Sequence, residues 1–377
     1  MSTVIDPAPQ PTRDVTRLPF WSAVRTVFGL EMKQRLRAKG WYWMLGIWFV
    51  VIAFIFVLAQ GVLGGENGTT NEGGILFDLL VGFVLLFGLL VSPGLSANAV
   101  NGDRAGGTLA ILQVTLLTPG QLLTGKWLAS WVGSLAFLVL STPFIFWALF
   151  LGGVNVEEAV VSLVMLAVEL GVVCALGVGI SALANRPLFS IVSTYMLVAL
   201  LSVGTVIVFG LSTMLVMEER TVRTSYYSYP ESSLDAFGTP DPDAELECLT
   251  QTYTTDLPNT QYITWVLAAN PFVVVADAVP YNVPEQTNTG GYMMGSSTYY
   301  SPGPMETISQ GIRSAQAGPD LEVTCEESSS QQFLERGVPI WPLGLAVQAA
   351  LAAALLLIAR RRLTMPAKRL AQGTRIA

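Results

Sequence analysis

The spacing of charged residues is the feature that most constrains this chain. Several stretches of the 377 residues contain no Asp, Glu, Lys or Arg. These stretches exceed the ~20 apolar residues that a helix needs to cross a bilayer. They predict an all-α polytopic membrane protein with six spanning helices, at residues 41–63, 76–97, 125–151, 159–184, 188–217 and 339–359. The fourth stretch is interrupted only by Glu169.

Basic residues in the connecting segments predict the orientation, because Lys and Arg concentrate on the cytoplasmic side. Sixteen of the 20 Lys and Arg fall before the first span, after the second and fourth spans, or in the tail. We therefore expect an integral protein of the cell membrane with both termini cytoplasmic. Residues 1–18 are predicted to form a disordered tail, and residues 360–377 a basic tail. Residues 40–217 are predicted to contain the first five spans.

Residues 218–338 have a different composition and are predicted to form an extracytoplasmic domain. They hold 17 of the 27 acidic residues and 9 of the 11 tyrosines, with only four basic residues. This composition favours short strands, turns and irregular chain, with some helix near 304–316. Residues 262–280 are apolar enough for a seventh span, but Pro271, Asp277 and the basic tail favour an interfacial or re-entrant helix.

Two of the three cysteines, Cys248 and Cys325, lie in this outer segment. An oxidising compartment favours a disulfide between them, and two free thiols are the alternative. The third, Cys174, is expected to be a small packed residue inside the fourth span.

A helix in the membrane surface is predicted for residues 19–39. Apolar residues recur there at helical spacing, namely Phe20, Trp21, Val24, Val27 and Phe28. Glu31 and Arg35 are four residues apart, which is a favourable spacing for a pair on one helix face.

The segment 98–124, between the second and third spans, is barely charged although it is predicted to be cytoplasmic. Residues 106–117 could form one short helix, and Pro119 could begin a second helix that runs into the third span. An uncharged helix pair of this kind suits the groove of a partner protein. Residues 120–126 have the spacing of a P-loop, but Trp127 stands where that motif needs Ser or Thr, so we expect no nucleotide site here.

This segment resembles the corresponding loop of ABC-2 type transporter permeases. The similarity rests on an acidic residue, a GTL core, a TP break and a Gly-Lys pair: Asp103, Gly107, Thr108, Leu109, Thr118, Pro119, Gly125 and Lys126. The surface helix at 19–39 and the Asn270-Pro271 element also match the family. This chain departs from it in having Ala105 where many members carry a second acidic residue.

The resemblance implies a permease subunit of an exporter that uses a separate cytoplasmic ABC ATPase dimer. It implies that the ATPase couples to Asp103, Arg104, Gly107, Thr108, Leu109, Thr118, Pro119 and Lys126, together with Glu31 and Arg35 of the surface helix. A second permease subunit, identical or related, is expected beside it. The exported substrate would be lipid-linked, amphipathic or peptidic, and ATP with Mg²⁺ would be bound by the partner, so no cofactor is expected here. The alternative is a regulatory or structural subunit that binds the ATPase but does not transport.

Other classes of function fit less well. The chain contains no histidine, which excludes imidazole bases and His-containing metal sites, and its net charge of −7 argues against nucleic acid as a partner. A membrane-embedded enzyme would need Asp or Glu chemistry, and only Glu169 is deep enough, so we predict no catalytic residues and no metal site.

Glu169 is either a helix–helix hydrogen-bonding group or part of a substrate or proton route. Asp78, at the start of the second span, is expected to be an exposed helix cap.

Overall fold

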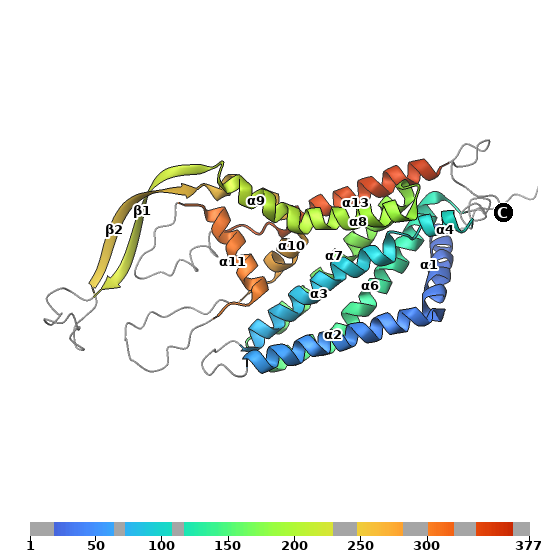
Figure 1. The fold of residues 1–377 in the computed structure, drawn as a ribbon, viewed down its shortest axis with the longest axis horizontal. Helices are drawn as coiled ribbons and strands as arrows, with labels where there is room; N and C mark the ends of the chain where they lie inside the picture. Colours follow the sequence, from blue (N-terminus) through green and yellow to red (C-terminus); the bar gives the residue numbers. More distant parts are fainter. Residues whose placement is uncertain are drawn as a thin grey trace, which may run out of the picture.

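The computed structural model describes residues 19–63, 72–107, 117–228, 247–281, 301–319 and 337–364. Most of these residues are helical, and the molecule is elongated (Figure 1). A helical bundle occupies the centre. A β-hairpin extends from one end, here named the hairpin end, and helix α1 lies at the other, named the α1 end (Figure 1).

Six helices in the described residues are long and apolar enough to cross a membrane, as the sequence predicts. They are α2 (Lys39–Leu63), α3 (Glu72–Ser96), α6 (Pro119–Phe150), α7 (Val156–Leu183), the α8–α9 helix and α13 (Trp341–Leu363). The fifth combines α8 (Pro187–Ala199), a π-helical turn η1 (Leu200–Gly204) and α9 (Thr205–Thr213).

Several helix bounds differ from the predicted spans, for example at the start of α3 and at the end of α13. Helix α6 begins at Pro119, as expected of the helix that runs into the third span, and it includes the predicted span start at 125 without a break. The fifth span ends at Thr213 instead of 217, because Met217 already pairs with Pro258 in the hairpin. A backbone committed to strand pairing cannot also continue the helix.

Helix α7 is the central element, because it packs against α3, α6, α8, α10 and α13. Its glycines allow these neighbours to come close. A Cβ atom added at Gly177 would lie 2.0 Å from Ser96 Oγ of α3, and one at Gly179 would lie 2.8 Å from Leu355 Cβ of α13. The small residues of this helix therefore serve packing within the chain. Large apolar side chains of α2 and of α8–α9 are exposed, as expected of faces in contact with lipid.

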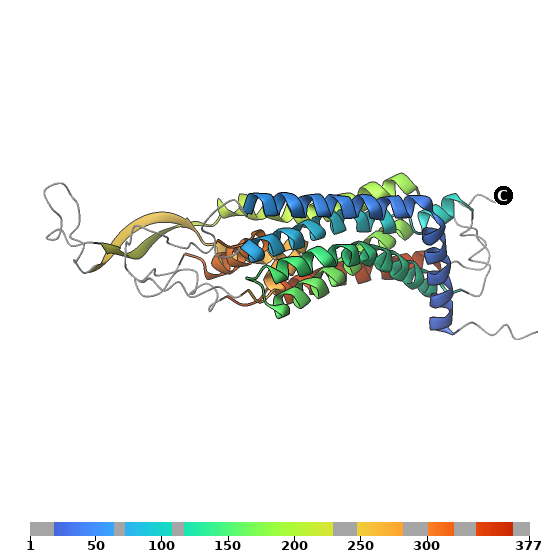
Figure 2. The ribbon, with the colours of Figure 1, turned by 90° about the horizontal axis from the view of Figure 1, so that it is seen from below.

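Helix α1 (Phe20–Arg37) lies across the end of the bundle, transverse to α2 (Figure 2). The turn between them is at Ala38, which has an extended backbone. The buried face of α1 comprises Ala23, Val24 and Val27, and it packs on α6. The predicted helix is therefore present, and one face is covered by protein.

The hairpin consists of β1 (Met217–Ser228) and β2 (Glu247–Pro258), which pair antiparallel over their whole length. The chain then forms the 3₁₀ turns η3 (Thr260–Tyr262) and η4 (Thr264–Ala269), helix α10 (Pro271–Ala278) and, later, α11 (Pro304–Ala317). Helix α11 matches the helix expected near 304–316. Residues 262–280 do not form a seventh span, because Pro271 starts a separate short helix that packs against α7 and α13.

Candidate functional site

Three residues of the predicted coupling set meet in one ion-paired cluster at the α1 end. The ammonium group of Lys126, on α6, pairs with Glu31 of α1, and it lies 2.6 Å from Asp103 Oδ2 of α4 (Asn101–Ala105). Lys126 is only 2% exposed, whereas Glu31 and Asp103 are 20% and 26% exposed. We call these three residues the basal ion cluster. It joins the surface helix, the segment after the second span and the third span.

A buried lysine needs charged partners, because removing its ammonium group from water costs several kcal/mol. The carboxylates of Glu31 and Asp103 both pair with the Lys126 ammonium group, and the cluster then carries one net negative charge. Their partial exposure keeps them in contact with water at the rim of the bundle. The cluster is therefore a stable junction that a partner protein could reach from the side of Glu31 and Asp103.

Arg35 makes a second connection from α1. Its Nη2 atom donates hydrogen bonds to the carbonyl oxygen of Leu95 at 3.1 Å and to Ser130 Oγ at 3.2 Å. Glu31 forms its close ion pair with Lys126, and the helix turns both Glu31 and Arg35 toward the bundle. The charge of Glu31 still acts favourably on Arg35 along α1. Burial lowers the pKa of the Arg35 guanidinium, and Glu31 raises it.

Arg104 fixes α4 to the end of α7. It donates to the carbonyl oxygen of Ala184 at 2.5 Å and to that of Ala182 at 3.4 Å, where the helix leaves its last carbonyls unpaired. Ser181 Oγ in turn accepts hydrogen bonds from the N–H groups of Val100 and Asn101. These two bonds could not be predicted from the sequence, because an isolated serine in an apolar span usually bonds to its own helix.

The start of α6 is as predicted from Thr118 and Pro119. Thr118 Oγ1 accepts from the N–H of Gln121, the Gln121 side chain accepts from the N–H of Thr118, and Pro119 occupies the first helical position. Residues 119–126 are helical, so the P-loop-like spacing is not part of a phosphate-binding loop.

Gly107 has a φ of 74°, which favours glycine. Thr108, Leu109 and most of the helix proposed for 106–117 lie outside the described residues.

At the hairpin end, Asn270 connects the short helix α10 to the fifth span. Its Oδ1 atom accepts from the N–H of Phe272 at 2.9 Å and so caps α10. Its Nδ2 atom donates to the carbonyl oxygen of Ser202 at 2.7 Å and to Thr205 Oγ1 at 2.9 Å. Both acceptors belong to the π-helical turn or its border, and such turns are frequent at functional sites.

Asp277 holds the start of the sixth span. Its Oδ1 atom lies 2.8 Å from Arg313 Nε of α11, and its Oδ2 atom accepts from the N–H groups of Ile340 at 2.6 Å and Trp341 at 3.0 Å. This carboxylate caps α13 from another helix. In the sequence, Asp277 indicated only that the apolar residues 262–280 do not span the membrane. The partners of Asp277 are far away in the sequence and could not be identified from it.

Asp78 is buried, not exposed as predicted, with 2% of its surface accessible. Its Oδ2 atom accepts from the N–H of Glu306 at 2.7 Å, in the first turn of α11. Helix α11 packs against α3, and its first turn covers this carboxylate.

Glu169 lies in the middle of α7 and is 1% exposed. It interacts with Gln348 of α13, whose Nε2 atom donates to the carbonyl oxygen of Ala269 at 3.1 Å. Within the described residues, neither Glu169 oxygen nor Gln348 Oε1 has a standard hydrogen-bond partner. Cys174, five residues further along α7, is buried beside Ser134 Oγ at 3.3 Å, as expected of a packed residue.

Cys325 lies outside the described residues, so its disulfide with Cys248 stays a prediction. Within the described residues, no group of His, Cys, Asp and Glu side chains is arranged to hold a metal ion.

Comparison with known proteins finds neither a matching family model nor a similar curated protein. The interpretation of the basal ion cluster therefore rests on the chemistry and positions of this chain's own residues.

Proposed function

We propose that this protein is the membrane subunit of an ABC-2 type exporter and converts ATP hydrolysis by a separate ATPase into movement of its spans. The observation that supports this most is the basal ion cluster. Glu31, Asp103 and Lys126 come from three distant parts of the chain, all three belong to the predicted coupling set, and they meet at one end of the bundle.

The contacts around the cluster provide a route for a mechanical signal. A partner that pushes on the segment after α4 acts on Asp103 and Arg104. Lys126 would pass the displacement to α6, and Arg104 would pass it to the end of the central helix α7. Arg35 links α1 to α3 and α6 in the same region. Such a network can bias a membrane domain between two arrangements, if the ATPase contacts each of them differently.

The proposed topology places the α1 end in the cytoplasm and the hairpin end outside. Two facts support it: the α1 end carries α1, α4 and the basic end of α13, and β1, β2 and α11, which belong to the acidic segment 218–338, are at the opposite end (Figure 1). We propose a second permease subunit as partner and a lipid-linked, amphipathic or peptide substrate. This topology places Cys248 and Cys325 on the oxidising side, where we propose a disulfide between them. If both thiols can be alkylated in unreduced protein, as measured by mass spectrometry, the disulfide is absent.

The test compares association with transport. Asp103→Asn should weaken co-purification of the ATPase and reduce ATP-dependent export in proteoliposomes, because it removes one charge of the cluster. Glu157→Gln, an exposed position at the other end of the bundle, is the matched control and should leave both unchanged.

Two results would contradict the proposal. If no ATPase associates with the wild-type protein under any nucleotide condition, the coupling function is wrong. If Asp103→Asn abolishes association but export continues unchanged, the protein is a regulatory subunit and does not transport.

A further inference from the structure

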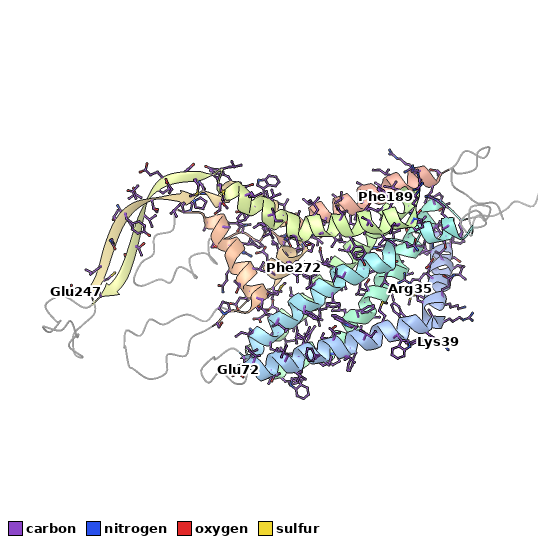
Figure 3. The ribbon with its side chains drawn as sticks, in the orientation of Figure 1. Arg35, Lys39, Glu72, Phe189, Glu247 and Phe272 are labelled. Atoms are coloured by element: carbon purple, nitrogen blue, oxygen red, sulfur yellow. The ribbon has the colours of Figure 1, made fainter. Side chains whose placement is uncertain are left out.

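A cleft of about 700 Å³ opens at the α1 end of the bundle. It lies where α7 ends, α8 begins and α13 ends. Its wall combines apolar side chains of α8 with two arginines, and the residues that matter here are Arg186, Leu188, Phe189, Val192 and Arg362. Figure 3 labels Phe189, which lies beside the C-terminal end of α13.

The apolar part of the cleft faces outward. Leu188, Phe189 and Val192 are 74%, 64% and 52% exposed, and they lie on one of the spanning helices. Exposed apolar side chains on a span contact lipid acyl chains. The cleft is therefore open to the hydrocarbon layer along α8.

The polar part of the cleft is cationic. Arg186 precedes the first turn of α8, and Arg362 is in the last turn of α13, so both lie at the level where spans end. Arg362 Nη1 donates to the carbonyl oxygen of Leu183 at 2.6 Å, which holds this guanidinium at the mouth of the cleft. No acidic residue is among the described residues that line the cleft.

Two further features increase the positive potential. Arg104 lies behind the cleft wall, bonded to the carbonyl oxygen of Ala184, and it is close enough to Arg362 for their charges to interact. The N-terminal end of α8, which begins at Pro187 next to Arg186, adds the partial positive charge of the helix dipole. An anion with an apolar tail can pair with the arginines of this cleft and pack its tail against the apolar side chains.

We propose that the cleft binds an anionic phospholipid, with its phosphate between Arg186 and Arg362 and one acyl chain along Leu188, Phe189 and Val192. Arginine forms paired hydrogen bonds with phosphate oxygens, and basic pockets between helices bind anionic headgroups in this way. The site does not depend on the exporter function proposed above. It would fix the α7–α8 turn to the end of the sixth span.

The test uses the full-length protein in neutral detergent and native mass spectrometry with phosphatidylglycerol or phosphatidylcholine as probe. Wild-type protein should retain phosphatidylglycerol preferentially. The double substitution Arg186→Gln and Arg362→Gln should weaken that binding about tenfold or more, since each arginine near a lipid surface contributes appreciably. Val192→Trp, which fills the apolar half but keeps both charges, should also weaken it.

Arg361→Gln is the control, because Arg361 is exposed next to Arg362 and does not line the cleft. Equal retention of the two lipids, or an equal loss in the control, would overturn the proposal. Displacement of phosphatidylglycerol by millimolar inorganic phosphate would overturn it too, since the site would then recognise a free anion. Thermal unfolding without lipid should be the same for the variants, which shows that a loss of binding is not a loss of folding.

Discussion

Lys126 Nζ lies 2.6 Å from Asp103 Oδ2, and the same ammonium group pairs with Glu31. The lysine is on the third span and the two acids are on the segments that precede and follow the first two spans. A single buried cation thus connects α1, α4 and α6. Displacement of any one of these elements would disturb the other two.

The first prediction concerns Lys126→Met. This change keeps most of the side-chain volume but leaves two carboxylates without their cation. Loss of one partner from a buried ion pair costs roughly 3–5 kcal/mol, and we expect about 2–3 kcal/mol because both acids are partly exposed. Thermal unfolding in detergent measures this effect. Lys33→Met, at an exposed position of α1, is the control and should change stability little.

A second prediction concerns the contact between α1 and α6. A Cβ atom at Gly125 would lie 2.7 Å from Val27 Cβ and 3.2 Å from the carbonyl oxygen of Val24. Gly125→Ala should therefore push α1 away from α6 and destabilise the protein by about 1–3 kcal/mol, the usual cost of overpacking. Limited proteolysis of α1 and thermal unfolding report the change.

Gly29→Ala is the matched control, because nothing lies within 4 Å of a Cβ atom added there. It should be neutral or stabilising by up to about 1 kcal/mol, since alanine favours a helix over glycine. Equal destabilisation by both substitutions would contradict close packing at Gly125.

The third prediction concerns Asp277, which pairs with Arg313 and caps α13. Asp277→Ala removes the acceptor for two N–H groups and leaves Arg313 without its ion pair. We expect a loss of about 3 kcal/mol or more, and faster hydrogen exchange at the start of α13. Asp256→Ala, at an exposed position of β2, should have almost no effect.

The six spans could be predicted because the bilayer imposes a length and an apolar composition on each helix. The start of α6 was predictable for a local reason, since Thr118, Pro119 and Gln121 form a cap within one turn. Local signals of this kind need no knowledge of the rest of the fold.

The partners of charged residues could not be predicted in the same way. Glu31 has the right spacing to pair with Arg35, but its close ion pair is with Lys126, because the crossing of α1 over α6 brings that cation closer. Asp78 was expected at the surface, yet the first turn of α11 covers it. Both outcomes depend on which helices meet, and sequence spacing contains no such information.

The fourth prediction concerns the link between α10 and the fifth span. Asn270→Ala removes the cap of α10 and the two bonds to Ser202 and Thr205, so it should cost about 2–3 kcal/mol. Thr205→Val removes one of these bonds and should cost about 1 kcal/mol. Thr213→Val is the control, because among the described residues the Thr213 hydroxyl bonds only to its own helix. If Thr205→Val and Thr213→Val have the same effect, the link does not stabilise the fold.

The last prediction concerns Glu169. An ionised carboxylate with no cation nearby would be very costly at this depth, so we expect the neutral acid. The amide of Gln348 is oriented by its bond to Ala269, which leaves its Oε1 atom free to accept a hydrogen bond. A neutral Glu169 can supply that hydrogen, and the two unpaired acceptors then satisfy each other.

Glu169→Gln should therefore preserve stability to within about 0.5 kcal/mol, because an amide also donates to Gln348. Glu169→Leu should cost about 1–3 kcal/mol, because Gln348 Oε1 is then buried without a donor. Thermal unfolding of the two variants, with transport measured on the same samples, separates the two roles. If Glu169→Gln is stable but inactive, the carboxyl group has to release its proton during the transport cycle. If it is stable and active, the side chain serves only as a hydrogen-bond donor between α7 and α13.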